Sequence, residues 1–268
     1  MIPKLIHYCW FGGNPKSEII QKCIASLKEF CPDYEIIEWN EDNFDVNSIP
    51  YTAAAYADKK WAYVSDYARL KTVFENGGIY LDTDVLLHNS LNELLQYECW
   101  LASDDVRYVN TGLGFGAEKG QSLIGELMCA YHTYDYDPTV TCVTKDTEII
   151  ARALPQWKKS DITQCYDRIC VIGLRNYGKY AKHLYTYSWA DEKTAKERLE
   201  KCTTGELYTR KQRWMYKVKC IVRKPEIVTH FDKQKGSRLE RIYTFCAYDL
   251  LDYGLIYFLK KLVKKIIQ

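Results

Sequence analysis

Residues 61–84 constrain the fold more than any other segment, because they read as a helix followed at once by a buried strand. Apolar residues recur at helical spacing over residues 61–76, and Gly77-Gly78 can end such a helix with a glycine cap. Residues 79–81 then form a short apolar run of strand-forming side chains. This order of elements favours a fold in which helices and strands alternate.

The rest of the chain up to residue 187 repeats this alternation. Strands are expected over residues 5–10, 34–39, 99–102, 112–115, 169–172 and 184–187, and helices over residues 17–30, 61–76, 121–132 and 146–153. Such alternation predicts an α/β sandwich with a mainly parallel sheet. Ligands of such sheets bind beyond the carboxyl ends of the strands, where Trp10 and Asp82 are expected to lie.

The pair Asp82 and Asp84 is the strongest chemical signal in the chain. Residues two apart in an extended strand point to the same side, so both carboxylates can address one small volume. Mg2+ and Mn2+ prefer oxygen ligands, and Mg2+ commonly pairs one or two carboxylates with the phosphates of a substrate. A metal site for a phosphorylated ligand is therefore expected, with a solvated turn as the alternative for so short a motif.

Composition bounds the class of protein. The 268 residues, 47% of them hydrophobic, can bury a full core and suit one large domain or one domain with an appendage. The 11 Cys are odd in number and include no Cys-x-x-Cys, so reduced, buried thiols are expected rather than a disulfide framework or a zinc ribbon. Neither a secretory leader nor a run of about 18 apolar residues is recognisable, which makes the cytoplasm the expected location.

Charge divides the chain into two parts. Residues 201–268 carry 16 Lys and Arg against 6 Asp and Glu, which leaves 21 against 29 for residues 1–200. We therefore expect a core domain over residues 1–192 and a basic, mainly helical extension over residues 193–268.

The end of this extension, residues 255–267, has the pattern of an interfacial helix. One face collects Leu255, Phe258, Leu259, Leu262, Val263 and Ile266, and four Lys gather on the other side. Such a helix either packs on the core with solvated lysines or binds an anionic membrane surface as a peripheral protein does. Basic charge is the only feature that would favour nucleic acid, so no nucleic-acid partner is expected.

Two further groups of residues lie before the Asp pair in the sequence. Asp66 and Arg69 are three apart and share one helical face, as a donor-holding pair or as a local surface salt bridge. Trp10 stands at a strand end beside Gly12-Gly13, where a ring and an accessible backbone suit a ligand. A core tryptophan is the alternative.

Read in order, residues 2–13, Ser65-Asp66 with Arg69, and residues 77–84 resemble the family-32 glycosyltransferases, the Asp-x-Asp sugar transferases of capsule and mannan synthesis. The same spacing is similar to the glucosylating domains of the large clostridial toxins. The likeness covers about residues 2–90, with further patches at residues 110–112 and 183–189. It implies a nucleotide-sugar-binding, Rossmann-like α/β fold of the GT-A type, a divalent metal, usually Mn2+ with Mg2+ as the substitute, and transfer with retention at the anomeric carbon.

The resemblance also implies roles in donor binding. Trp10 would stack on the nucleotide base, and Asp66 and Arg69 would hold the hydroxyls of the donor sugar. Tyr80 would line the same pocket, and Asn110 would hydrogen-bond donor or acceptor, with a turn-forming Asn as the alternative.

The catalytic roles fall, by the same resemblance, on the acidic pair. Asp82 would touch the ribose and reach the metal through water, and Asp84 would coordinate the metal that neutralises the diphosphate. His183 would be a further metal ligand, with a surface or core histidine as the alternative reading. Ser188 would lie near the phosphates and Trp189 over the donor, on a closing loop.

Two other classes of protein compete with this interpretation. The run 79–85 also resembles the Asp-x-Asp strand of haloacid-dehalogenase-type phosphatases and phosphotransferases, in which Asp82 would be the nucleophile. That family places the motif on an early strand, whereas here a strand, a turn and a helix precede it. A membrane-attached sugar-binding module would keep Trp10 and Trp189 but would not require both acids of the pair.

The sequence as a whole predicts a cytoplasmic, metal-dependent, retaining hexosyltransferase of polysaccharide biosynthesis. A nucleotide sugar, favoured as UDP-linked, is the expected donor. The expected acceptor is a growing glycan on a lipid carrier at the inner membrane face, and the lipid part depends on the basic extension.

Overall fold

The structure is a computed structural model that describes residues 1–103, 108–138, 140–160 and 162–186. The elements in chain order are β1 (Leu5–Cys9), α1 (Glu18–Phe30), β2 (Glu35–Trp39), α2 (Pro50–Ala57), α3 (Trp61–Asn76), β3 (Gly78–Tyr80), β4 (Val85–Leu87), the 3-10 helix η1 (Asn92–Gln96), β5 (Cys99–Ala102), β6 (Phe115–Ala117), α4 (Ser122–Ala130), α5 (Cys142–Ala153), β7 (Gln164–Tyr166), β8 (Ile169–Ile172), α6 (Leu174–Tyr177) and β9 (Ala181–His183). The predicted extension, residues 193–268, lies outside the described residues, and so does its terminal helix.

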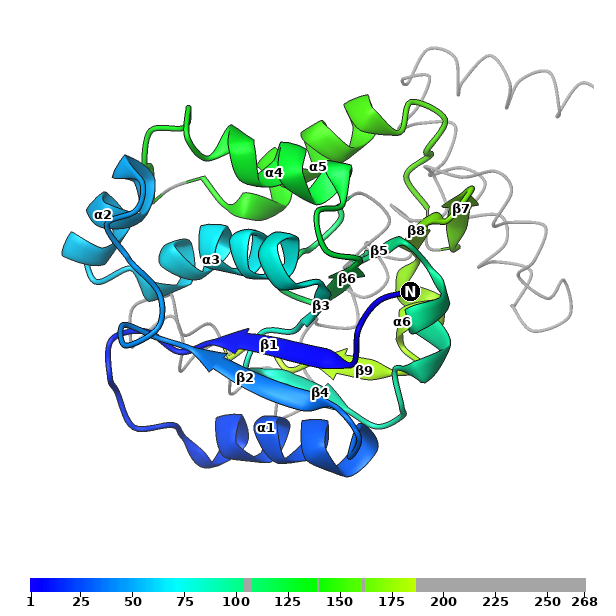
Figure 1. Cartoon of the computed structure of the whole chain (residues 1–268), viewed down its shortest axis with the longest axis horizontal. Helices are drawn as coiled ribbons and strands as arrows, with labels where there is room; N and C mark the ends of the chain where they lie inside the picture. Colours follow the sequence, from blue (N-terminus) through cyan, green and yellow to red (C-terminus); the bar gives the residue numbers. More distant parts are fainter. Residues whose placement is uncertain (104–107, 139, 161, 187–268) are drawn as a thin grey trace, which may run out of the picture. The chain divides into compact units, whose positions relative to one another are not determined.

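The main sheet of the described part has seven strands in the order β2-β1-β3-β6-β5-β8-β7 (Figure 1). Strand β1 pairs in parallel with β2 and β3, and β5 pairs in parallel with β8. Because β6 lies antiparallel between β3 and β5, both parallel groups point the same way, and only β6 and the edge strand β7 oppose them in this sheet of described residues. The prediction of an α/β fold with a mainly parallel sheet is confirmed.

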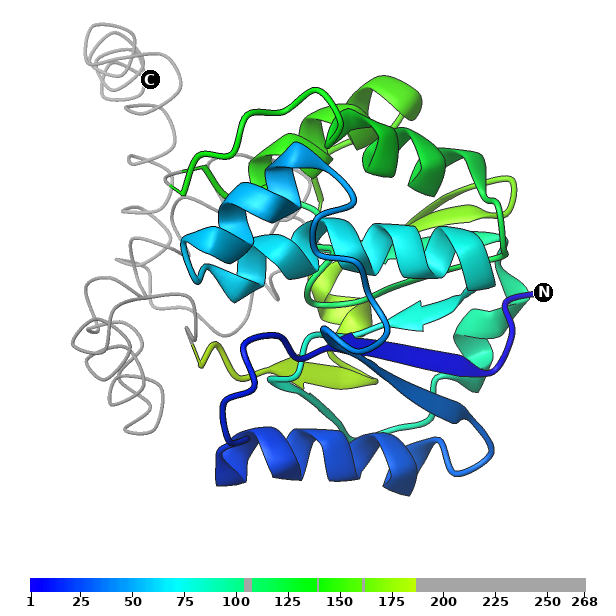
Figure 2. The same cartoon turned by 60° about the vertical axis from the view of Figure 1, so that its left-hand side comes forward.

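Helices cover both faces of this sheet. In Figure 1, α1 lies on one side and α3, α4 and α5 lie on the other, and Figure 2 shows the same layers from a second direction. Side chains alternate accordingly, because Ile79 and Leu81 pack into the core on the α1 side while Tyr80 between them packs into the core under α3. Burial on both faces explains why this strand is continuously apolar.

The two glycines after α3 have separate structural tasks. Gly77 adopts a φ of 71°, and its N–H donates to the carbonyl of Val73 at 2.7 Å, which ends the helix as predicted. Gly78 has a φ of 103°, and a Cβ there would lie 2.8 Å from the imidazole of His7. A side chain at Gly77 would press on Pro3 and Lys119, and one at Gly78 on Leu5 and His7 of β1, so both positions favour glycine.

Three predicted elements are displaced along the chain. The strand expected over residues 112–115 is β6, which begins only at Phe115 because residues 110–113 form a turn. The strand expected over residues 184–187 is β9, which ends at His183, and Tyr185 has a left-handed φ of 52° that interrupts extended pairing.

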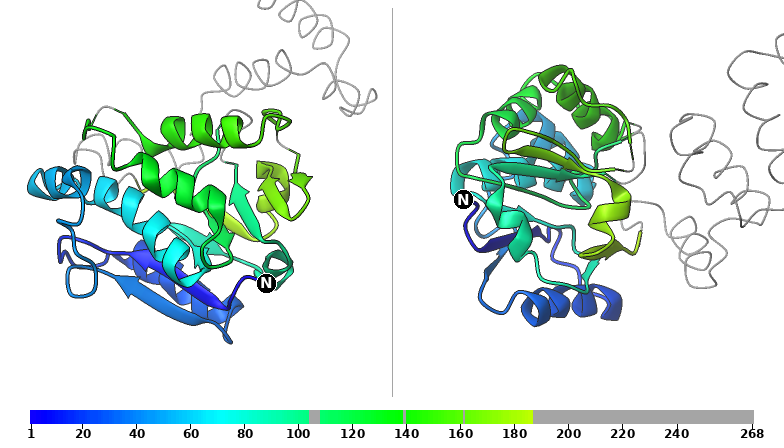
Figure 3. Two further views of the ribbon diagram at one scale, coloured as in Figure 1. Left: turned by 45° about the horizontal axis from the view of Figure 1, so that its top comes forward. Right: turned by 90° about the vertical axis from the view of Figure 1, so that its right-hand side faces the viewer.

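Helix α5 begins four residues before the predicted Asp146. Its N-cap residue, Thr141, is of a type that favours helix starts, but it makes no side-chain capping bond, and no Glu or Gln stands three residues later to complete a capping box. Figure 3 shows α5 beside α4 on the same face of the sheet.

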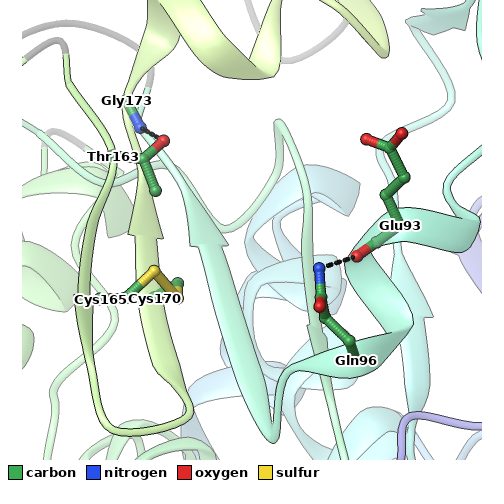
Figure 4. Close-up of a disulfide and its surroundings, with 6 residues drawn as sticks. All are labelled: Glu93, Gln96, Thr163, Cys165, Cys170 and Gly173. Carbon is green, nitrogen blue, oxygen red and sulfur yellow. Dashed lines mark hydrogen bonds between the residues drawn. A yellow bond between two sulfur atoms is a disulfide. The ribbon is translucent and has the colours of Figure 1, made fainter.

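The expectation of reduced, buried cysteines holds for five of the described residues and is wrong for one pair. Cys165 and Cys170 form a disulfide between neighbouring positions of the β7–β8 hairpin (Figure 4). Beyond this bridge, the Thr163 hydroxyl of the same hairpin accepts a hydrogen bond from the Gly173 N–H at 3.3 Å. The hairpin lies at the sheet edge away from Asp82. Two cysteines five residues apart form no pattern that distinguishes a disulfide from two free thiols in the sequence.

No helix among the described residues combines the length and the apolar composition needed to cross a bilayer.

Candidate active site

Asp82 and Asp84 lie where the carboxyl end of β3 turns into β4. The prediction that both occupy one extended strand is wrong in detail, because β3 ends at Tyr80 and residues 82–85 form a tight turn closed by a 3.0 Å bond from the Val85 N–H to the Asp82 carbonyl. The two carboxylates nevertheless lie close together, as predicted. A turn brings the two carboxylates toward one volume as alternation along a strand would have done.

His183 joins this pair through strand pairing. Strand β9 pairs antiparallel with β4, and His183 stands opposite Val85, the residue directly after Asp84. One ligand-type atom from each of Asp82, Asp84 and His183 lies within 4.8 Å of the others. The sequence places these residues about a hundred positions apart, and the two-stranded sheet brings them together.

The carboxylate of Asp84 is held from both sides. His183 Nε2 lies 3.0 Å from Oδ1, and both the N–H and the hydroxyl of Thr186 donate to Oδ2, at 2.9 and 3.0 Å. Burial alone would raise the pKa of Asp84, but the hydrogen bonds from His183 and Thr186 lower it below its ordinary value. Asp84 is therefore ionised at neutral pH, as a metal ligand has to be.

Two carboxylates and one imidazole suit a divalent cation that accepts oxygen and nitrogen ligands. Asp82 keeps about a third of its side chain exposed, while Asp84 and His183 are nearly buried, so a cation held there would face the solvent on the Asp82 side. A phosphate group could complete its coordination from that side.

The predicted donor pair forms a continuous network with Asp82. Arg69 makes an ion pair with Asp66, and its Nη1 lies 3.8 Å from Oδ1 of Asp82. The Tyr80 hydroxyl donates to the same Asp82 oxygen at 2.9 Å, and the Arg69 guanidinium lies over the Tyr80 ring, 5.2 Å from its centroid. The Arg69 Nε also donates to the Ser65 carbonyl at 3.0 Å, which fixes the guanidinium on α3.

This network is buried, unlike the surface salt bridge that the sequence also allowed. Asp66 is 6% exposed and Arg69 is 3% exposed. Burial raises the pKa of Asp66 to about 6, although the Arg69 charge acts to lower it. The carboxylates of Asp82 and Asp66 outweigh the effect of burial on Arg69 and raise its pKa, so the guanidinium stays charged.

Trp10 follows β1 at the same edge of the sheet. Because β1 and β3 run in parallel with His7 opposite Tyr80, Trp10 lies level with the start of the turn that carries the acidic pair. The ring is partly exposed, its Nε1 donates to the Asn14 carbonyl at 2.8 Å, and the Lys16 ammonium lies 5.3 Å from the ring centroid. One part of the ring packs against the core and another part is exposed, so stacking on a nucleotide base stays a prediction.

Asn110 forms a turn, which was the alternative to direct contact with a ligand. Its side-chain oxygen accepts the N–H groups of Gly112 at 2.9 Å and Leu113 at 3.3 Å. The Gly112 carbonyl in turn accepts the N–H of Asp82 at 2.9 Å, so this turn is bonded directly to the acidic pair. Direct contact of Asn110 with a donor remains a prediction.

Ser188 and Trp189, the two predicted residues of a closing loop, lie outside the described residues. Among the residues that sequence reasoning did not select, Thr186, Gly112 and Asp146 stand out. Thr186 bonds to Asp84, and Gly112 leaves no room for a side chain, since a Cβ there would lie within 3.0 Å of side-chain atoms of Asp82 and Arg69. Two of them gave a signal in the sequence, since Gly112 lies in the patch at residues 110–112 and Asp146 is an acid on the apolar side of α5.

Comparison with known proteins agrees with this geometry. Residues 17–101 match the family described as a glycosyltransferase sugar-binding region containing a DXD motif. An inositol phosphoceramide mannosyltransferase 3 of Schizosaccharomyces pombe is 31% identical over 107 residues, which cover 37% of this chain and 29% of that protein. A human alpha-1,4-N-acetylglucosaminyltransferase is 29% identical over 119 residues, which cover 44% of this chain and 33% of that protein.

Solved structures are similar at lower identity. The PaToxG glycosyltransferase is 19% identical, with a TM-score of 0.48 over 57% of this chain and 70% of its own. The galactosyltransferase LgtC, solved with donor and acceptor sugar analogues, is 15% identical, with a TM-score of 0.35 over 73% of this chain and 82% of its own.

The family match and the two curated relatives confirm the predicted resemblance to the Asp-x-Asp sugar transferases. The α/β architecture agrees with the GT-A type of fold that this resemblance implied. The alternative prediction of a phosphatase that uses Asp82 as a nucleophile is not supported, because the family and both relatives are sugar transferases. The matched segments span about a third of the two relatives or less.

Proposed function

We propose that this chain, whose residues 17–101 carry the sugar-binding region of the DXD glycosyltransferases, is a metal-dependent, retaining enzyme that moves a hexose from a nucleotide sugar to a glycan acceptor. The observation that carries the proposal is the convergence of Asp82, Asp84 and His183 within 4.8 Å, beside the buried Asp66–Arg69 pair. One group of side chains suits a cation and a diphosphate, and the other suits the hydroxyls of a sugar.

Asp84, Asp82 and His183 would hold Mn2+ or Mg2+. A cation bound there supplies Lewis-acid stabilisation of the charge that develops on the departing nucleoside diphosphate. The protein contributes the fixed position of these ligands, because Asp84 is already ionised and oriented by Thr186. The Thr186 bonds to Oδ2 can stay in place when a cation binds at Oδ1, where the cation would replace the contact with His183 Nε2.

On the sugar side, Arg69 and Asp66 offer a donor and an acceptor of hydrogen bonds in a site that excludes water. Tyr80 orients Asp82 through its hydroxyl, and Trp10 would stack on the base at the same sheet edge. We assign no catalytic base, because in a front-face reaction with retention the leaving phosphate takes up the proton of the acceptor hydroxyl. Ser188 and Trp189 would close over the donor.

The acceptor side of the proposal depends on the sequence alone. We propose a glycan on a lipid carrier at the cytoplasmic membrane face, because the basic helix pattern of residues 255–267 suits an anionic lipid surface. Deletion of residues 254–268 should abolish binding to liposomes of anionic lipid at low salt. Unchanged liposome binding would remove the membrane part of the proposal and leave the transferase part intact.

A panel of sugar donors tests the transferase itself. UDP-glucose, UDP-galactose, UDP-N-acetylglucosamine and GDP-mannose are each incubated with the full chain, with and without Mn2+, and the release of nucleotide is measured. The panel includes N-acetylglucosamine and mannose because the two relatives are named for these sugars. We expect metal-dependent release from one donor, with a UDP-hexose favoured, and loss of that release in Asp84→Asn. Release that is indifferent to the metal and to this substitution would contradict the proposal.

A further inference from the structure

Helix α5 carries a buried acid that the proposed function leaves unused. Asp146 is fully buried, at 0% exposure, although it follows Cys142 by four residues and precedes Ile149 by three on the buried face of the helix. An apolar residue at position 146 would extend the apolar face of α5 and avoid the cost in free energy of burying a carboxyl group. The position of this acid therefore needs an explanation beyond packing.

The contacts of Asp146 lead to the turn beside the acidic pair. Its Oδ2 accepts a hydrogen bond from the hydroxyl of Thr111 at 2.7 Å, its Oδ1 accepts a longer one from the Tyr131 hydroxyl at 3.4 Å, and Thr111 is also fully buried. The next residue of α5, Thr147, accepts the N–H of Val109 through its hydroxyl at 3.0 Å. Two consecutive residues of one helix thus anchor the turn at residues 110–113, one through Val109 just before it and one through Thr111 within it.

The same turn is hydrogen-bonded to the backbone of Asp82. Gly112, which follows Thr111, uses its carbonyl to accept the Asp82 N–H at 2.9 Å. Gly112 also packs so closely that a Cβ on it would lie within 3.0 Å of side-chain atoms of Asp82 and Arg69. A shift of the turn by a few tenths of an ångström would therefore move the Asp82 backbone or press on both side chains.

We propose that Asp146 is a positioning residue that sets the place of Asp82 through Thr111 and Gly112. The inference rests on the proposed function only in that Asp82 serves the metal and the donor. The route from α5 to the Asp82 N–H consists of one side-chain hydrogen bond, one peptide unit and one backbone hydrogen bond. Helix α5 thereby fixes the geometry of a site to which Asp146 itself contributes no ligand.

The conservative variant Asp146→Asn separates positioning from folding. Burial raises the pKa of Asp146 to about 7 although the Thr111 hydrogen bond acts to lower it, so a neutral side chain of this shape suits the site. An amide oxygen can still accept the Thr111 bond. Asp146→Ala removes the acceptor, and Ile150→Ala is the matched control, because it cuts a fully buried residue of the same helix whose side chain cannot hydrogen-bond to the turn.

The first measurement is amide hydrogen exchange of Asp82 by NMR, compared with exchange of Leu81 in the same protein. Leu81 is the internal reference, because its N–H donates to the His7 carbonyl at 3.1 Å and not to the turn. We expect Asp146→Ala to speed exchange of Asp82 about five- to tenfold relative to Leu81, the effect of one weakened hydrogen bond. Asp146→Asn and Ile150→Ala should leave this ratio within about twofold.

The second measurement is the binding of Mn2+ alone, followed by the electron paramagnetic resonance signal of the free ion. We expect about a tenfold loss of affinity in Asp146→Ala, rescue in Asp146→Asn, and no such loss in Ile150→Ala. An unchanged Asp82-to-Leu81 ratio in Asp146→Ala, or equal changes in Ile150→Ala, would overturn the inference. If the wild-type chain binds no Mn2+, the metal part of the proposed function fails, and the exchange ratio alone decides on positioning.

Discussion

The two halves of the candidate site are built differently. The Asp66–Arg69–Asp82 side is part of the core. Its Asp66 and Arg69 side chains are buried, and α3, β3 and the turn at residues 110–113 support it. The Asp84–His183 side is held by β4, β9 and the segment that reaches Thr186, which form a small sheet beside the main one. Damage to the first half should therefore unfold the protein, and damage to the second half should chiefly remove activity.

Loss of the buried guanidinium should have the largest effect. Arg69→Met leaves the Asp66 and Asp82 carboxylates without their cation, and we expect a loss of about 3–5 kcal/mol in the free energy of unfolding measured with urea at pH 8. The control is Arg168→Met, an exposed arginine paired with Glu118, which should cost less than about 1 kcal/mol. Equal losses in the two variants would show that burial does not distinguish the Arg69 side.

Removal of the central carboxylate of the other half should affect rate before stability. We expect Asp84→Asn to reduce metal-dependent nucleotide release at least about 100-fold, or roughly 2.7 kcal/mol, because a neutral amide is a poor ligand for a hard cation. Its unfolding free energy should fall by only about 1 kcal/mol, since the amide oxygen keeps one hydrogen bond. Asp42→Asn, the same change at an exposed position, should alter neither quantity. Release that stays within about threefold of wild type in Asp84→Asn would contradict the role of this carboxylate.

Much of the first half was readable from the sequence. The Asp66–Arg69 spacing needs only the periodicity of one helix, and the glycine cap of α3 predicts where the following strand begins. The contribution of His183 depends on pairing between β4 and β9. These strands have three residues each, and the sequence does not show that they pair. The role of Asp146 could not be predicted either, because a buried acid on a helix shows its partner only in three dimensions.

The pH dependence of stability gives a smaller and more specific test. Asp146 has a pKa of about 7 in the folded protein, against 3.8 for the free side chain, so the folded state holds a proton that the unfolded state has lost between these values. Stability from this group is present at low pH and falls as pH rises toward and through about 7.

The matched variant for this test is Asp146→Asn, which does not titrate. Between pH 5 and pH 8.5 the wild-type protein should lose about 2 kcal/mol of unfolding free energy more than the variant does. Parallel pH profiles for the two proteins would show that Asp146 is ionised in the fold throughout this range. The exposed Asp42→Asn variant again serves as the control, and its profile should follow the wild type.

The smallest expected effect belongs to His183. We expect His183→Gln to weaken Mn2+ binding about tenfold, or roughly 1.4 kcal/mol, with less than about 1 kcal/mol of change in stability. His88→Gln makes the same chemical change at an exposed position just after β4 and should leave Mn2+ affinity unchanged. If both variants bind Mn2+ as the wild type does, the metal is held by the carboxylates alone, and the two halves of the site differ less than their structures suggest.

Anomalous scattering from a crystal soaked with MnCl2 and UDP tests the central claim most directly. We expect one strong Mn2+ peak within about 2.0–2.3 Å of an Asp84 carboxylate oxygen, with His183 and the UDP diphosphate in the same coordination sphere and Asp82 bonded directly or through water. A peak at another place, or a well-occupied UDP whose phosphates lie away from the turn at residues 82–85, would contradict it.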